Sequence, residues 1–162
     1  MDEMVKRTQV YLNAMYGGNS GYEVIPERKI PWEKMWQTSI PENGITGWTT
    51  IYALTRALQI ELGITATADS FGPTTISKFN SKFPNGIKQQ NSSDTTENNI
   101  YAIIQGALWC KGYSTGATGI TKHFYSGTGG AVKKMKEDAG LTNTDSTVTL
   151  AVMKALLSMN QY

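Results

Sequence analysis

Apolar residues recur every three or four positions in six stretches of the chain. This spacing places them on one face of an α-helix. In the first stretch, over residues 3–16, Val5, Leu12 and Met15 share such a face, and Asp2 is a candidate N-cap. The pattern therefore predicts a helix that starts directly after Asp2.

Glycine, proline and capping residues set the expected limits of the next three helices. The second stretch, "WTTIYALTRALQIEL", ends at Gly63, and the third starts with Pro73, which suits the first position of a helix. Asp94 and Glu97 have the spacing of a capping box, which predicts a fourth helix over 95–111. The residues expected to face inward in the last five helices are Ile51, Leu54, Leu58 and Leu62; Ile76, Phe79 and Phe83; Ile100, Ile104 and Leu108; Val132, Met135 and Ala139; and Val148, Val152 and Leu156.

The stretch "HFYSGTGGAVKKMKEDAGL" predicts the fifth helix. Ser126 is its expected cap, Gly140 its expected end, and the paired glycines at 129–130 indicate a close approach of another chain segment. The sixth helix is expected to start at Asp145 or Ser146. All predicted elements are helical, so the expected fold class is all-α.

Composition and charge exclude several function classes. Of the 162 residues, 40% are apolar, as in a globular protein with a core. Fifteen basic and thirteen acidic residues leave a net charge of +2 with no basic cluster, so we expect no nucleic-acid partner. One cysteine, Cys110, and one histidine, His123, are too few for a disulfide framework or a structural zinc site. We expect no metal and no cofactor.

The N-terminal stretch "MDEMVKRTQVYLNAMYGG" has acidic residues where a signal peptide has basic ones, and it lacks an unbroken apolar region. No later stretch approaches the roughly 18 apolar residues of a membrane span. The sequence thus predicts no membrane partner. It leaves open a mature fragment or export by a route that needs no signal peptide.

The six predicted helices divide into two sets of three that match in sequence. The order and approximate spacing agree, apart from a longer first loop in the first half. We predict a first repeat over 1–83 with a loop insertion at 17–46, a polar linker over 84–94, and a second repeat over 95–162. A lone core is marginal at this size, so the two repeats are expected to pack together. The matching pairs are Thr8–Leu12 with Ile104–Leu108, Thr50–Leu54 with Thr128–Val132, Leu62–Ile64 with Ala139–Leu141, and Asp69–Ser70 with Asp145–Ser146.

The repeated pattern resembles the peptidoglycan-binding-domain family of bacterial and phage cell-wall hydrolases. The resemblance covers nearly all of both halves. It departs from the family where Tyr125 replaces a glycine and where Thr147-Val148 replaces the pair that the first half keeps as Phe71-Gly72. The matching positions are Gln9, Leu12, Gly47, Thr50, Ala53-Leu54, Leu58-Gln59, Gly63-Ile64, Asp69, Phe71-Gly72 and Thr75 in the first half, and Gln105, Leu108, Gly112-Tyr113, Phe124, Thr128, Ala131-Val132, Met135, Gly140-Leu141 and Asp145 in the second.

The resemblance implies a module that binds bacterial peptidoglycan without cutting it and that directs a linked lytic domain, as in an endolysin, to the wall. Such a module acts outside the cell or in the cell wall, and a phage-encoded one is released at lysis. Uncharged glycan and short stem peptides are best bound by aromatic surfaces and hydroxyl groups. The candidate ligand residues at the loop-to-helix junctions are Tyr22, Trp48, Tyr113, Tyr125 and Thr128, each with core packing or capping as the alternative.

No catalytic residue is predicted. His123 has no second histidine or metal-site motif beside it, and Cys110 has no evident activating base unless His123 lies near it in space. Two carboxylates can cleave a glycan, and Glu33 and Glu42 in the insertion are the best such pair. A hydrolase that uses them is one alternative function. A structural or interaction module of a phage or spore is another.

Two tryptophans in the insertion, Trp32 and Trp36, are four residues apart, so one helical turn would place both rings on one side. They could fill the gap between the repeats or form a platform on which sugar rings stack. Filling the gap is favoured, because exposed paired tryptophans reduce solubility.

Overall fold

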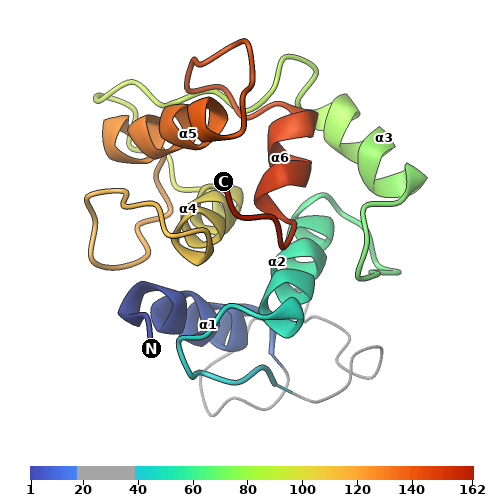
Figure 1. Ribbon diagram of the computed structural model, residues 1–162. Helices are drawn as coiled ribbons and strands as arrows, with labels where there is room; N and C mark the ends of the chain where they lie inside the picture. Colours follow the sequence, from blue (N-terminus) through green and yellow to red (C-terminus); the bar gives the residue numbers. More distant parts are fainter. Residues whose placement is uncertain (18–38) are drawn as a thin grey trace.

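The computed structural model describes residues 1–17 and 39–162 (Figure 1). Within these ranges the regular structure is helical apart from one isolated bridge, which confirms the prediction of an all-α fold. None of the helices in this part of the chain is long and apolar enough to cross a membrane. The helices are α1 (Glu3–Tyr16), α2 (Trp48–Glu61), α3 (Pro73–Lys82), α4 (Asn99–Cys110), α5 (Ser126–Asp138) and α6 (Leu150–Leu156).

Several helix ends follow the predicted signals. Asp2 caps α1, because its Oδ1 accepts the backbone N–H of Met4 at 2.8 Å. Gly63 after α2 and Gly140 after α5 have φ values of 84° and 73°, the left-handed conformation that commonly ends a helix. Pro73 is the first residue of α3. The local signals thus act as expected at these four ends.

The predicted start of α4 at residue 95 is wrong. The helix begins at Asn99, and Asn98 caps it by accepting the backbone N–H of Ile100 at 2.9 Å. Asp94 instead accepts the backbone N–H of Thr96 at 3.0 Å, which closes a local turn before the helix. Aspartate side chains stabilise such turns as readily as helix starts. The capping-box spacing therefore marks a turn here and not the start of the helix.

The predicted start of α6 is also wrong. The helix begins at Leu150, and Thr149 caps it. The carboxylate of Asp145 accepts hydrogen bonds from Lys136 Nζ at 2.9 Å and from the Thr147 backbone N–H at 3.0 Å. Because Asp145 ties the end of α5 to the following loop, it is not available as the cap of α6.

In α5, Ser126 is the first helical residue and not the predicted cap, and the capping position has no side-chain hydrogen bond. At the paired glycines the close neighbours are side chains and not backbone, and only one of the two glycines has any. A Cβ on Gly129 would overlap the side chain of Gln89, whereas a Cβ on Gly130 would meet open space. Gly129 is thus the more closely packed of the two, although the exposed end of the Gln89 side chain can move aside.

Helix α4 is the centre of one hydrophobic core that both halves share. It packs against α1 and α2 of the first half and against α5 and α6 of the second, and Figure 1 shows it between α1 and α5. Leu12, Leu58, Ile104, Leu108 and Met135 come from four of these helices, have no exposed surface and belong to one buried cluster. The expected packing of the two halves against each other is thus observed.

A buried glutamine braces the first half. Gln9 on α1 donates its amide to the carbonyl of Ile45 at 3.1 Å and to the hydroxyl of Thr50 at 3.0 Å. Its amide oxygen accepts the backbone N–H of Gly44 at 2.9 Å. One side chain therefore holds the loop that leads into α2.

The matching glutamine braces the second half in the same way. Gln105 on α4 donates to the carbonyl of Gly119 at 3.1 Å and to the hydroxyl of Thr115 at 3.4 Å, and it accepts the backbone N–H of Thr121 at 3.0 Å. Like Gln9, it bonds one loop carbonyl, one threonine hydroxyl and one loop N–H. The sequence match between the halves thus corresponds to a partial match in hydrogen bonding, since Thr50 lies on α2 whereas Thr115 lies in the loop before α5.

The polar segment 84–94 contacts the second half at two buried residues. Ile87 and Val148 exchange two backbone hydrogen bonds, at 2.8 and 2.9 Å. The amide oxygen of Gln90 accepts the backbone N–H of Phe124 at 2.7 Å. The division of the chain at this segment stays a prediction, but the segment itself lies against the core.

Candidate functional site

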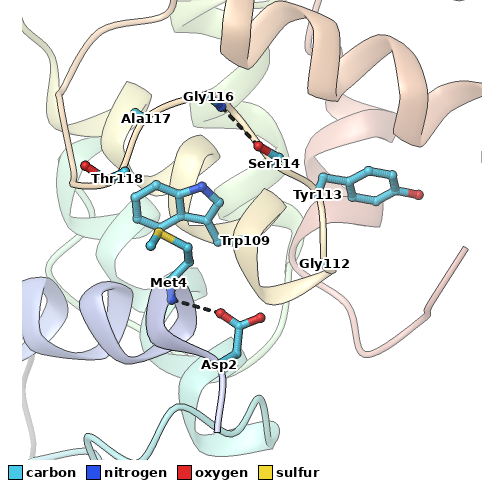
Figure 2. Close-up of a pocket in the computed structure, with 9 residues that line it drawn as sticks. All are labelled: Asp2, Met4, Trp109, Gly112, Tyr113, Ser114, Gly116, Ala117 and Thr118. Carbon is cyan, nitrogen blue, oxygen red and sulfur yellow. Dashed lines mark hydrogen bonds between the residues drawn. The ribbon is translucent and has the colours of Figure 1, made fainter.

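A pocket of about 360 Å³ lies where the C-terminal end of α4 meets the N-terminal end of α1 (Figure 2). The loop over 112–118, which leaves α4, closes its third side. Because α1 belongs to the first half and α4 to the second, the pocket depends on their packing. Its lining residues are Asp2, Met4, Trp109, Gly112, Tyr113, Ser114, Gly116, Ala117 and Thr118.

The indole ring of Trp109 lines this pocket. The residue is 2% exposed, and its Nε1 donates to the hydroxyl of Thr115 at 3.1 Å. Met4 lines the same pocket, as Figure 2 shows. A buried tryptophan usually pairs its N–H, and this bond fixes the ring plane. The ring therefore shapes the pocket and offers little surface of its own.

The loop over 112–118 is held at both ends. Gly112 and Gly116 have φ values of 87° and 79°, and Ser114 Oγ accepts the backbone N–H of Gly116 at 3.2 Å, as Figure 2 shows. At the far end the guanidinium of Arg7 on α1 donates to the carbonyl of Thr118. The loop is thus fixed to α1 as well as to α4.

Tyr113, one of the predicted ligand residues, lies at the rim of the pocket. Its hydroxyl donates to Asp138 Oδ2 at 2.7 Å, and Figure 2 shows its ring directed away from Trp109. Burial, followed by the hydrogen bond to Asp138, raises the pKa of the Tyr113 hydroxyl to about 12. The hydroxyl therefore stays protonated at neutral pH and is occupied as a donor to α5.

Replacing Gly127 by alanine is expected to destabilise the protein by about 1–3 kcal/mol, because the new Cβ would overlap the backbone carbonyl oxygen of Thr115 in the pocket loop. Gly130→Ala in the same helix is the matched control. It adds a methyl group in open space and should stabilise the protein by about 0.5–1 kcal/mol through helix propensity. Urea denaturation of both variants measures the difference. Equal stabilities would show that the loop at Thr115 can move to accommodate the new methyl group.

An exposed apolar surface borders the same end of α4. Trp48, the first residue of α2, is 52% exposed and stacks on Tyr52 with ring centroids 5.4 Å apart, and Ile45 is 63% exposed. Between them, the hydroxyl of Thr46 donates to the carbonyl of Cys110 at 3.2 Å. This bond holds the surface formed by Ile45, Trp48 and Tyr52, here called the aromatic surface, beside the pocket.

Tyr125 lies in a different environment. Its hydroxyl donates to the carbonyl of Asp94 at 2.6 Å, and its ring stacks on His123 with centroids 5.0 Å apart. His123 Nε2 lies 3.9 Å from a carboxylate oxygen of Glu97. The ring of Tyr125 thus has a neighbour in the second half, and its hydroxyl bonds the polar segment 84–94.

The structure brings two of the five predicted ligand residues to one end of α4. These are Trp48 and Tyr113, which belong to different halves. Thr128 is 5% exposed on α5, and Tyr22 lies outside the described residues. A single binding site made of all five is therefore not what the described residues form.

Among the described residues, neither Cys110 nor Glu42 lies in an activating environment. Burial raises the pKa of the Cys110 thiol to about 11, so the thiol is protonated at neutral pH. Glu42 accepts the side-chain amide of Asn13 at 2.7 Å, and Glu33 lies outside the described residues, as do Trp32 and Trp36. In the described ranges, no group of three potential metal ligands comes together.

Sequence analysis did not single out Asp2, Met4 or Trp109 as site residues. Their one common signal is position: two lie at the predicted start of the first helix, and Trp109 lies three residues before a glycine that ends the fourth. That signal is weak, because helix ends far apart in sequence meet only when α1 packs on α4. The pocket is thus a product of tertiary packing.

No protein-family model and no solved structure matches the chain. The chain is similar along its whole length to two proteins of Bacillus subtilis strain 168. It is 49% identical over 162 residues to the uncharacterized protein FadG and 46% identical over 162 residues to the uncharacterized protein YbfG. The chain covers 24% of FadG and 19% of YbfG, so it spans about a quarter or less of these relatives.

Proposed function

We propose that this chain is a non-catalytic module that binds cell-wall peptidoglycan and directs a linked lytic enzyme to the bacterial wall. The observation that carries the proposal is the aromatic surface beside the pocket. A stacked tryptophan that is 52% exposed costs solubility, and such apolar patches are typical of binding surfaces. Aromatic rings can stack on the apolar faces of sugar rings, and the pocket rim adds hydroxyl and backbone groups.

The repeat and the relatives support the same proposal. Gln9 and Gln105 each accept a hydrogen bond from the loop that leads to the next helix of their half. This similarity agrees with the resemblance to tandem peptidoglycan-binding repeats. A similar segment forms 24% and 19% of two longer bacterial chains, as expected of a module carried beside other domains. On this proposal the site of action is the cell wall, outside the cell, and the partners are glycan and stem peptide.

Purified insoluble wall sacculi should retain the protein in a pull-down, and Trp48→Ala should reduce the apparent affinity by about tenfold, the effect of losing one aromatic anchor. Leu141→Ala is the control, because it also truncates an exposed apolar residue, 38% exposed, in the loop after α5. Equal thermal melts would show that both variants fold.

Four outcomes would contradict the proposal. The wild-type protein does not sediment with sacculi, or Trp48→Ala sediments as well as Leu141→Ala. A fall in the turbidity of the sacculi, abolished by Glu33→Gln or Glu42→Gln, would instead indicate a hydrolase. Retention by a phage or spore protein and not by sacculi would indicate a structural module.

A further inference from the structure

A second pocket, of about 370 Å³, lies on the seam between the two halves and is lined by charged and amide side chains. Glu61 and Lys82 come from the C-terminal ends of α2 and α3 in the first half. Glu97, Asn98, Asn99 and Lys122 come from the second half, around the N-terminal end of α4. The pocket shares no residue with the aromatic surface or with the pocket beside it.

One carboxylate in this pocket is held in place. Glu61 Oε2 accepts the hydroxyl of the fully buried Tyr16 at 2.9 Å and the side-chain amide of Asn99 at 3.4 Å. Glu61 is the last residue of α2, where a negative charge opposes the helix dipole and reduces helix stability. Hydrogen bonds from α1 and α4 therefore hold the Glu61 carboxylate at the C-terminal end of α2, although a negative charge there destabilises the helix.

A lysine faces the same pocket from a constrained backbone. Lys122 has a φ of 59°, the one positive value at a residue other than glycine in the described chain. Its carbonyl accepts the backbone N–H of Asn98 at 3.1 Å, which ties it to the start of α4. Its ammonium group forms no ion pair within the described residues. Backbone outliers of this kind concentrate at binding and catalytic sites.

From this arrangement of charges we infer that the seam pocket binds a small zwitterion, of the class of a free α-amino acid or a dipeptide. The carboxylates of Glu61 and Glu97 receive the ligand's ammonium group. The ammonium groups of Lys82 and Lys122, with the positive end of the α4 dipole, receive its carboxylate. A volume of about 370 Å³ is in the range of small-molecule sites and holds a ligand of this size.

Titration of ¹⁵N-labelled protein with alanine tests the inference by NMR. We expect saturable shifts at the side-chain amides of Asn98 and Asn99 and at the backbone of Lys122. N-acetylalanine lacks the ammonium group and alaninamide lacks the carboxylate, so each should bind at least about tenfold more weakly. Dialanine places the two charges farther apart, and its affinity relative to alanine distinguishes a dipeptide from a free amino acid. No saturable shift, or equal affinity for alanine and N-acetylalanine, would overturn the inference.

Lys122→Gly removes the ammonium group and suits the positive φ, so this variant should fold and bind alanine about tenfold more weakly. Lys78→Gln is the control, since it removes one positive charge from an exposed position on α3 outside the pocket. Equal loss in both variants would indicate a general charge effect and contradict the assignment. The inference is separate from wall binding, because free amino acids test this pocket and sacculi test the aromatic surface.

Discussion

Leu108→Ala is expected to destabilise the two halves together, by about 2–5 kcal/mol, the usual cost of removing a buried leucine side chain and leaving a cavity. Leu108 has no exposed surface and lies on α4, which packs against helices of both halves. The cavity therefore opens in the shared core, and neither half retains an undisturbed interior. We expect one cooperative unfolding transition before and after the substitution.

Hydrogen exchange of amides in α1 and in α5, combined with urea denaturation, measures this effect at one site in each half. Both sets of amides should lose protection by the same free energy. Leu141→Ala serves as the control, because an exposed leucine contributes little and its loss should change stability by less than about 0.5 kcal/mol. Two separate transitions, of which only the second-half one shifts, would show that the halves fold independently.

The second large effect is expected from Gln105→Ala. This substitution leaves the Thr121 backbone N–H and the Gly119 carbonyl without the side chain that bonds them, and Gln105 itself is fully buried. A net hydrogen bond contributes about 0.5–1.5 kcal/mol, and these two bonds are part-buried, so water replaces some of the lost bonding. The loop before α5 should also lose order, since the glutamine is one of the links between this loop and α4.

Gln9→Ala should have a similar effect on the loop before α2, because Gln9 makes the matching set of bonds. The control is Gln89→Ala, an exposed glutamine with no comparable role. Chemical denaturation of the three variants compares them directly. If Gln9→Ala and Gln105→Ala were no less stable than Gln89→Ala, the hydrogen bonds of Gln9 and Gln105 would contribute nothing to stability. The structural match between the halves would then lose its energetic support.

The helices were accessible to prediction because their signals are local. Residues on one helical face are three or four positions apart, and Asp2, Gly63, Pro73 and Gly140 act within one turn of the helix they limit. Where a local signal has two uses, prediction went wrong. Asp94 closes a turn where a cap was expected.

The candidate sites were harder to predict from the sequence. Trp48 and Tyr113 were selected from sequence, but nothing along the chain indicated that they lie at the same end of α4. Asp2, Met4 and Trp109 were not selected, because each has an ordinary local role as a cap or an apolar helix residue. The seam pocket combines Glu61 and Lys122, which are far apart in sequence and share no motif.

The all-α class, the periodicity of the helices, several of their ends and the internal repeat could be predicted from the amino-acid sequence, because each depends on residues within a few positions of one another or on matching segments. Tertiary structure alone decided that α4 lies at the centre of a shared core, that Asp145 binds Lys136 and does not start α6, and that two pockets form between the halves. These features depend on which helix faces meet, and that is set by the packing of side chains distant in sequence.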